Sequence, residues 1–219
     1  MPRRSPPRSL RGQAQLAGLL VGPGVKGYTA EDDTRLPFDV EDAKALLAEA
    51  GYPDGFRLTL RCPNDRYIND EAICTALPPM LAQIGIELDV DAVPVSQYWG
   101  ELQEGRFDMY LLGWSPGTFD AAHPIRFLMA TPNEERKLGS WTFGNYSDPR
   151  VDELLPQIQQ ELDPETRQAM VDDAHRILNE DVVYIPLHIQ PLVWAVRQGV
   201  EVQQRPDNFF LLRWVRVDG

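Results

Sequence analysis

Helical and strand-like patterns of apolar residues alternate along the first half of the chain. Apolar residues recur every three to four positions in three segments, which predicts helices over 39–50, 68–84 and 96–102. Every second residue is apolar in the segments between them, which predicts strands over 56–62, 86–93 and 107–112. The connections between these strands are long enough for parallel pairing, so the pattern predicts an α/β layer sandwich.

Local signals indicate where the predicted helices begin and break. Asp39 or Glu41 can cap the first helix, whereas Pro78-Pro79 falls in the middle of the second and should kink or split it. Farther along, Asp148-Pro149 and Asp163-Pro164 each place a capping residue before a proline at the first helical position. These pairs predict two amphipathic helices, a helical pair that spans 149–178.

The pattern is looser elsewhere. A short helix is expected at 123–129, and strand-like runs occur at 182–189, 192–196 and 209–217. Residues 1–38 show no sustained period and contain Pro-Gly punctuation. We therefore expect them to form a tail and a loop, partly disordered, ahead of one domain over 39–219.

Charge is divided unevenly along the chain. No acidic residue precedes Glu31, whereas five of the 21 basic residues precede Gly27, so residues 28–219 carry 33 acidic against 16 basic side chains. Such an acidic body repels nucleic acid and anionic lipid. The basic head and the apolar run 16–21 have the outline of a signal peptide, but Gly and Gln interrupt the run, so no competent signal is expected. No run of 18 apolar residues is present.

Cysteines and histidines indicate no metal site. Cys62 ends a predicted strand and Cys74 lies in a predicted helix, and we expect two buried free thiols rather than a disulfide. The three histidines are 52 and 13 residues apart, which is not the spacing of metal ligands. His175 is expected on a solvated helix face, and His188 is either a core histidine or part of a cleft wall.

No catalytic signature is found. The sequence lacks the motifs of dinucleotide-binding loops, phosphate loops, nucleophile elbows and zinc proteases. No acidic residue is paired with a second carboxylate at catalytic spacing. We therefore expect no enzyme, no catalytic residue and no cofactor.

Signals of solute binding are stronger. Trp114 follows Gly113 at the carboxyl end of the third predicted strand, where open α/β sheets form ligand crevices. Its indole offers an apolar face and an N–H donor, and Asp120 offers a charge for an amine or hydroxyl. Each has an alternative role, Trp114 as a core residue and Asp120 as a helix cap. Either a buried edge or a stacking wall for a ligand would explain the aromatic run Trp141, Phe143 and Tyr146.

Several motifs occur in order along roughly nine-tenths of the chain: Asp39 to Tyr52, Asn69 to Ile86, Phe107-Asp108-Met109 with Gly113-Trp114, Asn145 to Asp152, and Ile185 to Val200. No single motif is specific, but the ordered set resembles the extracellular solute-binding proteins, family 5, of oligopeptide, dipeptide and nickel ABC transporters. The resemblance implies a periplasmic-binding-protein-like lobe of type II, a mixed sheet flanked by helices. It also implies a periplasmic receptor that presents a small-molecule or peptide ligand to ABC permease subunits.

Family members have two lobes, and the resemblance covers only the second. It implies that residues 39–219 are the C-terminal lobe, including a return segment 182–219, and that the N-terminal lobe is missing from this chain. The apolar face that would meet that lobe is then exposed, so we expect a homodimer through this face or poor solubility. An orphaned interaction domain without ligand binding is the alternative.

One departure from the family concerns the ligand. Peptide-binding members have Trp-x-x-Asp after the Gly-Trp pair, where the Asp pairs with a peptide's amino terminus, but Gly117 stands there in this chain. A three-residue insertion would instead give Asp120 that role. The ungapped match is favoured, and it implies a ligand without a free amino terminus. The expected ligand contacts are Gly113, Trp114, Gly117, Asp120, Asn145, Tyr146 and His188.

Overall fold

Three parallel strands form the central sheet of the molecule. The computed structural model describes residues 14–217. In it, β2 (Arg57–Pro63) lies between β3 (Glu87–Val93) and β4 (Met109–Tyr110), and both pairs are parallel. The parallel pairing expected from the alternation of helices and strands is confirmed. Two smaller pairs are antiparallel, so parallel and antiparallel sheets are mixed in this α/β fold.

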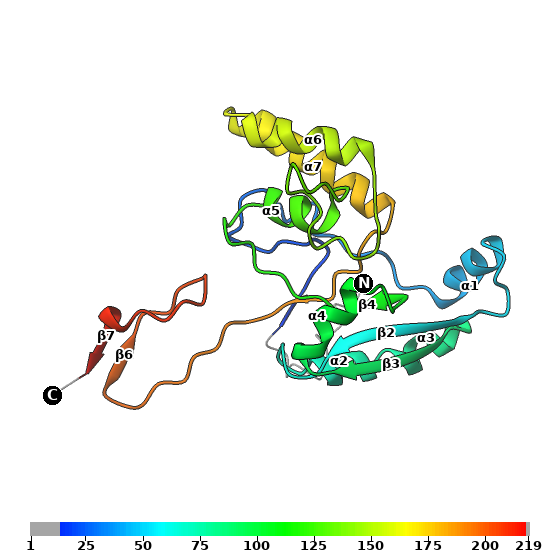
Figure 1. Cartoon of the computed structure of the whole chain (residues 1–219), viewed down its shortest axis with the longest axis horizontal. Coiled ribbons are helices and arrows are strands. Elements are labelled where there is room, and N and C mark those ends of the chain that lie inside the picture. Colours follow the sequence, from blue (N-terminus) through cyan, green and yellow to red (C-terminus); the bar gives the residue numbers. More distant parts are fainter. Residues whose placement is uncertain (1–13, 218–219) are drawn as a thin grey trace.

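Short helices pack around this sheet (Figure 1). They are α1 (Val40–Glu49), α2 (Asp70–Thr75), α3 (Pro78–Leu81), a 3-10 turn (Ala82–Ile84) and α4 (Val95–Gln103). Asp39 caps α1 as predicted, because its carboxylate accepts the backbone N–H groups of Glu41 and Asp42. The helix expected over 68–84 is split before Pro78, as predicted for a residue that lacks the N–H.

The two cysteines form a disulfide, so the prediction of two free thiols was wrong. Cys62 at the end of β2 and Cys74 in α2 are both fully buried and are bonded to each other. The periodicity located the strand and the helix but not the packing of one on the other, which brings residues 12 positions apart into contact. The bridge closes the loop 63–73 into a ring.

A second core lies among the helices of the other half. It involves α5 (Ala122–Pro124), a π-helical turn (Ile125–Met129), α6 (Pro149–Gln160) and α7 (Pro164–Glu180). Asp148 and Asp163 cap α6 and α7, each with a proline at the start of the helix, which confirms the predicted helical pair. Figure 1 shows α6 and α7 side by side, away from the central sheet.

The segment before α1 contributes to this second core. Residues 14–28 are mostly turns and bends, as expected for a loop, but they do not form a peripheral tail: Leu19 and Val21 are buried. β1 (Gln15–Leu16) pairs with β5 (His188–Ile189), and the backbone of Lys26 bridges that of Asp120. The apolar run 16–21 therefore contributes side chains to the core. The basic residues up to Arg11 lie outside the described residues.

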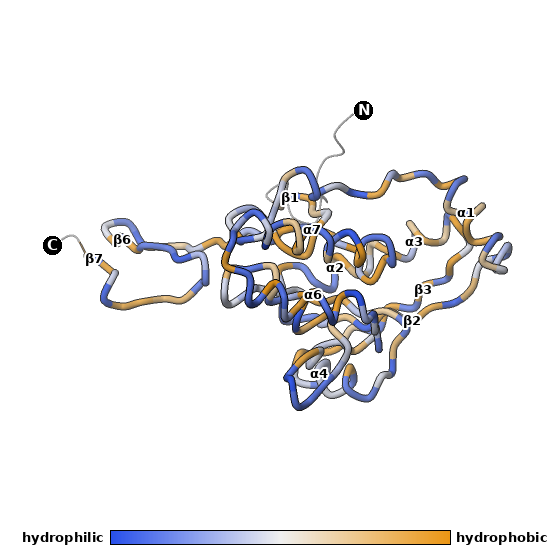
Figure 2. The backbone as a smooth tube through the Cα atoms, turned by 90° about the horizontal axis from the view of Figure 1, so that it is seen from above, coloured by the Kyte–Doolittle hydropathy of each residue, from blue (hydrophilic) through white to orange (hydrophobic). Residues whose placement is uncertain are grey.

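Residues 190–217 form an arm that extends away from the central sheet and from the helices α6 and α7 (Figure 1). Among residues 14–217, its two strands β6 (Val200–Val202) and β7 (Val215–Val217) pair only with each other, and a 3-10 turn (Leu212–Trp214) precedes β7. The predicted runs 192–196 and 182–187 form no strand. Figure 2 shows apolar positions along the arm, and its exposed apolar side chains are Leu192, Val193, Val196, Phe209, Phe210, Leu212 and Val217.

His175 is buried, which corrects the expectation of a solvated helix face. It lies on the inner side of α7, is 1% exposed, and neither ring nitrogen has a hydrogen-bond partner among the described residues. Burial lowers the pKa of His175 to about 4, although the nearby Asp32 opposes the shift. At neutral pH, His175 is therefore an uncharged imidazole on the buried face of α7.

Loss of the disulfide should destabilise the chain. Reduction, or the double substitution Cys62→Ala with Cys74→Ala, opens a short closed loop and so raises the conformational entropy of the unfolded chain. This lowers the free energy of unfolding by about 3 kcal/mol. Urea unfolding with and without reductant measures the effect. The double variant is the control, because reductant should leave its midpoint unchanged. An unchanged wild-type midpoint, with both thiols titrated as free, would contradict the prediction.

His175 should make stability fall in mild acid. Its folded pKa lies below the unfolded value, so the unfolded state binds more protons, and stability present above pH 6.5 is lost as the pH falls toward 4. Between pH 7 and pH 5 the loss is about 2 kcal/mol. His175→Leu should remove that part of the pH dependence in urea unfolding. An identical pH profile for both proteins would show that the imidazole does not titrate in this way.

Candidate functional site

The ends of two parallel strands meet at Gly113. Past β4 the chain continues beside β2, where the N–H of Leu111 donates to the carbonyl of Arg61. Tyr67, in the loop after β2, donates its hydroxyl to the Gly113 carbonyl over 3.2 Å. A Cβ on Gly113 would lie 2.7 Å from the Tyr67 ring, so only glycine permits this approach. The predicted crevice position at the carboxyl ends of the strands is thus built from two loops.

Trp114 is half-buried and lies between the core and the surface. It packs against the helical core, and its ring centroid lies 5.5 Å from that of His123, 6.1 Å from Phe127 and 6.1 Å from Trp141. Its indole N–H donates to Nδ1 of His123 over 3.1 Å. The donor that the sequence offered to a ligand is therefore used internally, and only the face and edge of the ring remain for contact.

A set of partly exposed rings extends from Trp114 through a chain of ring contacts. We call this set the aromatic cluster: Trp99, Phe107, Tyr110, Trp114, His123, Phe127, Trp141 and Phe143. Neighbouring centroids lie 4.8 to 6.1 Å apart, in tilted or edge-to-face arrangements. Trp141 and Phe143, from the predicted aromatic run, belong to it, whereas nothing in the sequence placed Trp99, His123 and Phe127 beside them.

Asp120 has a structural role. Its Oδ1 accepts the N–H of Ala122 over 2.9 Å, as a helix cap does, and the guanidinium of Arg167 over 2.8 Å. Both side chains are largely buried, at 19% and 10% exposed. The residue at the N-cap of α5 is Ala121, one position after Asp120, so Asp120 accepts a backbone N–H beside the helix start without being its cap residue. The same oxygen is paired with a cation, so the structure gives no support to Asp120 as an anchor for a ligand amine.

Gly117 lies at the exposed tip of the loop between Trp114 and Asp120. Its φ is outside the left-handed region, so the backbone does not require glycine. A Cβ built on Gly117 would have one neighbour within 4 Å, Nε2 of His123 at 3.7 Å. Gly117 therefore leaves an open space whose wall is an imidazole nitrogen.

The remaining predicted contacts lie apart from this space. Asn145 is exposed, with a left-handed φ of 55°, and the hydroxyl of Tyr146 donates to Asp181 over 2.8 Å. Among the described residues, Tyr146 makes no ring contact with the aromatic cluster. His188 is half-buried on β5, and burial lowers its pKa. These three residues remain predictions as ligand contacts.

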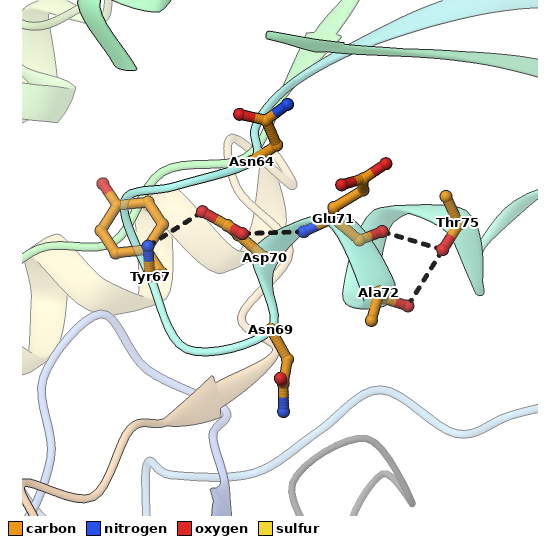
Figure 3. Close-up of a pocket in the computed structure, with 7 residues that line it drawn as sticks. All are labelled: Asn64, Tyr67, Asn69, Asp70, Glu71, Ala72 and Thr75. Carbon is orange, nitrogen blue, oxygen red and sulfur yellow. Dashed lines mark hydrogen bonds between the residues drawn. The ribbon is translucent and has the colours of Figure 1, made fainter. Parts of the chain in front are cut away.

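A polar pocket of about 500 Å³ lies beside Gly113, within the loop that the disulfide closes (Figure 3). It is lined by Asn64, Tyr67, Asn69, Asp70, Glu71, Ala72 and Thr75. The Asp70 carboxylate accepts the backbone N–H groups of Arg66, Tyr67 and Glu71, so this acid stabilises the loop. Tyr67 links the pocket to Gly113 through its hydroxyl, and sequence reasoning did not anticipate the pocket.

Metal sites and membrane-spanning helices are absent from the described residues. No group of three or more His, Cys, Asp or Glu side chains within 14–217 could hold a metal ion. None of the helices in that part of the chain is long and apolar enough to cross a membrane. Burial lowers the pKa of His123, with Arg126 adding to the shift and Asp120 opposing it, so the histidine of the site is neutral.

Solved structures define the fold class. The chain matches a dipeptide binding protein from Pseudoalteromonas sp. SM9913 in complex with Met-Leu at a TM-score of 0.79 and 21% identity, over 95% of this chain and 41% of that one. It matches the periplasmic binding protein DppA from Helicobacter pylori, in complex with the peptide STSA, at 0.77 and 21%, over 95% and 40%. The fold is therefore that of a periplasmic-binding-protein-like lobe.

Sequence comparison gives the family. The model of the bacterial extracellular solute-binding proteins, family 5 (Middle), matches residues 8–135, and the chain belongs to this family. The glutathione-binding protein GsiB of Shigella flexneri serotype 5b is 30% identical over 84% of this chain and 36% of its own length. GsiB of Escherichia coli K12 is 31% identical over 73% and 31%. The chain thus spans about a third of the length of these relatives.

Removing the Asp120 carboxylate should destabilise the fold. Asp120→Ala leaves a buried guanidinium without its partner and the N–H of Ala122 without its acceptor, a loss of about 3 to 5 kcal/mol. Asp120→Asn keeps the shape and an acceptor, so its loss should be smaller. Urea unfolding compares them. An Asp120→Ala protein as stable as wild type would refute the structural role.

Proposed function

We propose that this chain is the solute-binding lobe of an ABC importer's receptor, and that it holds a small solute against the aromatic cluster beside Gly113. The observation that carries the proposal is a set of partly exposed rings around Trp114 at the carboxyl ends of parallel strands, in a chain of family 5. Aromatic rings with a few polar groups near them are typical of a binding site. The polar pocket at Tyr67, whose hydroxyl reaches Gly113, supports the proposal.

The solute need not be a peptide. Matched structures of this fold hold the peptide STSA, Met-Leu and, in a Microbacterium hydrocarbonoxydans protein with a TM-score of 0.74, 4-hydroxybenzoate hydrazide. The matched curated relatives are named for glutathione. All are small polar solutes, and we propose the same broad class for this chain, with binding rather than chemistry as its activity.

The proposed partners are an ABC permease and a second lobe. The matched relatives are about three times as long as the shared region, and a cleft between two lobes needs surface from both. We propose a periplasmic location for the receptor. The Cys62–Cys74 disulfide supports it, because such bonds persist in oxidising compartments.

A second candidate is an interaction domain that binds no solute by itself. The exposed apolar residues of the arm favour it, since Phe209, Phe210 and Leu212 are each more than half exposed. They would associate with a second copy or with another lobe. Sedimentation at several concentrations separates the candidates, because a monomer that binds solute would contradict the second.

Trp114 should be the main contact of the solute. Trp114→Ala is expected to lower affinity at least tenfold, since it removes a central aromatic contact. Trp194→Ala, in the arm, is the matched control and should leave affinity unchanged. Calorimetric titration of the whole chain with glutathione and with Met-Leu measures both, and circular dichroism checks folding. Equal affinities for wild type and a folded Trp114→Ala protein would overturn this site.

A further inference from the structure

The hydrogen bond between Trp114 and His123 fixes where the imidazole carries its proton. An indole nitrogen is a donor and never an acceptor, so Nδ1 of His123 must accept at 3.1 Å. A neutral imidazole then carries its hydrogen on Nε2. His123 therefore presents a donor on the side of the ring away from Trp114.

That donor borders the open space at Gly117. Nε2 lies 3.7 Å from the position a Cβ would take on Gly117, and no other heavy atom comes within 4 Å of that position, apart from the immediate chain neighbours. A solute acceptor that lies beyond that position, nearer to Nε2 than 3.7 Å, can reach the nitrogen at ordinary hydrogen-bond distance.

The surroundings keep the imidazole neutral. Protonation would put a second hydrogen on Nδ1, pointing at the indole N–H, and would break that hydrogen bond. The charged groups that act on the ring are Arg126, which disfavours protonation, and Asp120, which favours it but is paired with Arg167. Partial burial also disfavours the charge, and together these effects lower the pKa of His123.

We propose that the His123 Nε2–H, exposed by the missing side chain at Gly117, selects solutes that place a hydrogen-bond acceptor there, a carboxylate or carbonyl oxygen, and rejects those that place an ammonium group there. An ammonium group has only donors, so it would meet another donor and lose its water. This inference rests on the proposed solute-binding function and names its ligand class: solutes whose amine is absent, acylated or cyclised at this position.

The geometry is tested without any solute. Long-range proton–nitrogen spectra of the labelled chain should show the neutral His123 ring protonated on Nε2 at pH 7 to pH 8. Gly117→Asp, which the backbone allows, should raise the pKa of His123 by about one unit, because it places a carboxylate beside Nε2. The control is Gly100→Asp, which adds the same charge on an open surface and should have little effect. A proton on Nδ1, or equal responses to the two substitutions, would overturn the proposal.

Selectivity is tested with N-acetyl-leucine, which has a carboxylate and no amine, and leucine amide, which has an amine and no carboxylate. Wild type should bind N-acetyl-leucine roughly tenfold more tightly, the value of one hydrogen bond to a charged group. Gly117→Asp should reverse the order, and His123→Phe, which keeps a ring beside Trp114, should abolish it. A wild-type preference for the amine would refute the selection. Binding of neither probe, with the Nε2–H form and the Gly117→Asp response intact, would count against the solute-binding function and leave the donor in place.

Discussion

The ion pair between Asp120 and Arg167 is buried where the loop 113–120 meets α7, and the arrangement of this loop depends on it. Through one oxygen, Asp120 holds both the guanidinium and the start of α5, the helix that carries His123. The backbone of Lys26 bridges the same residue, so three distant segments converge there. Separating the two partners of such a buried pair is strongly unfavourable, so the pair holds the three segments together.

Because this junction is held in place, it determines which nitrogen of His123 faces the loop 113–120. With α5 fixed, His123 lies where Trp114 can donate to it, and that single contact decides which ring nitrogen faces Gly117. On the other side, the disulfide and the Asp70 carboxylate hold the loop that places Tyr67 against Gly113. The loop 113–120 is thus anchored at both ends, while its tip is open to solvent.

Periodicity and capping signals predicted the elements well, because they depend on neighbours in the sequence. The parallel strands, the split at Pro78 and the caps at Asp39, Asp148 and Asp163 are all of this kind. The errors concern packing between elements. The disulfide needs α2 on β2, and the burial of His175 needs the segment near Asp32 against α7. The site shows the same division: Gly113 and Trp114 follow from the strand pattern, whereas Tyr67 and His123 arrive through tertiary contacts.

In the arm, by contrast, the sequence pattern predicts a strand that the structure does not contain. Apolar residues over 192–196 predict a strand, yet the described chain offers that segment no strand to pair with, and Val193 and Val196 are exposed. Strand propensity mostly reflects packing against neighbours, so such a pattern is meaningful only when a partner surface exists. The matched relatives contain much more chain than the shared region. The same reasoning applies to the aromatic cluster: its partly exposed rings act as a binding surface only if a solute or another surface covers them.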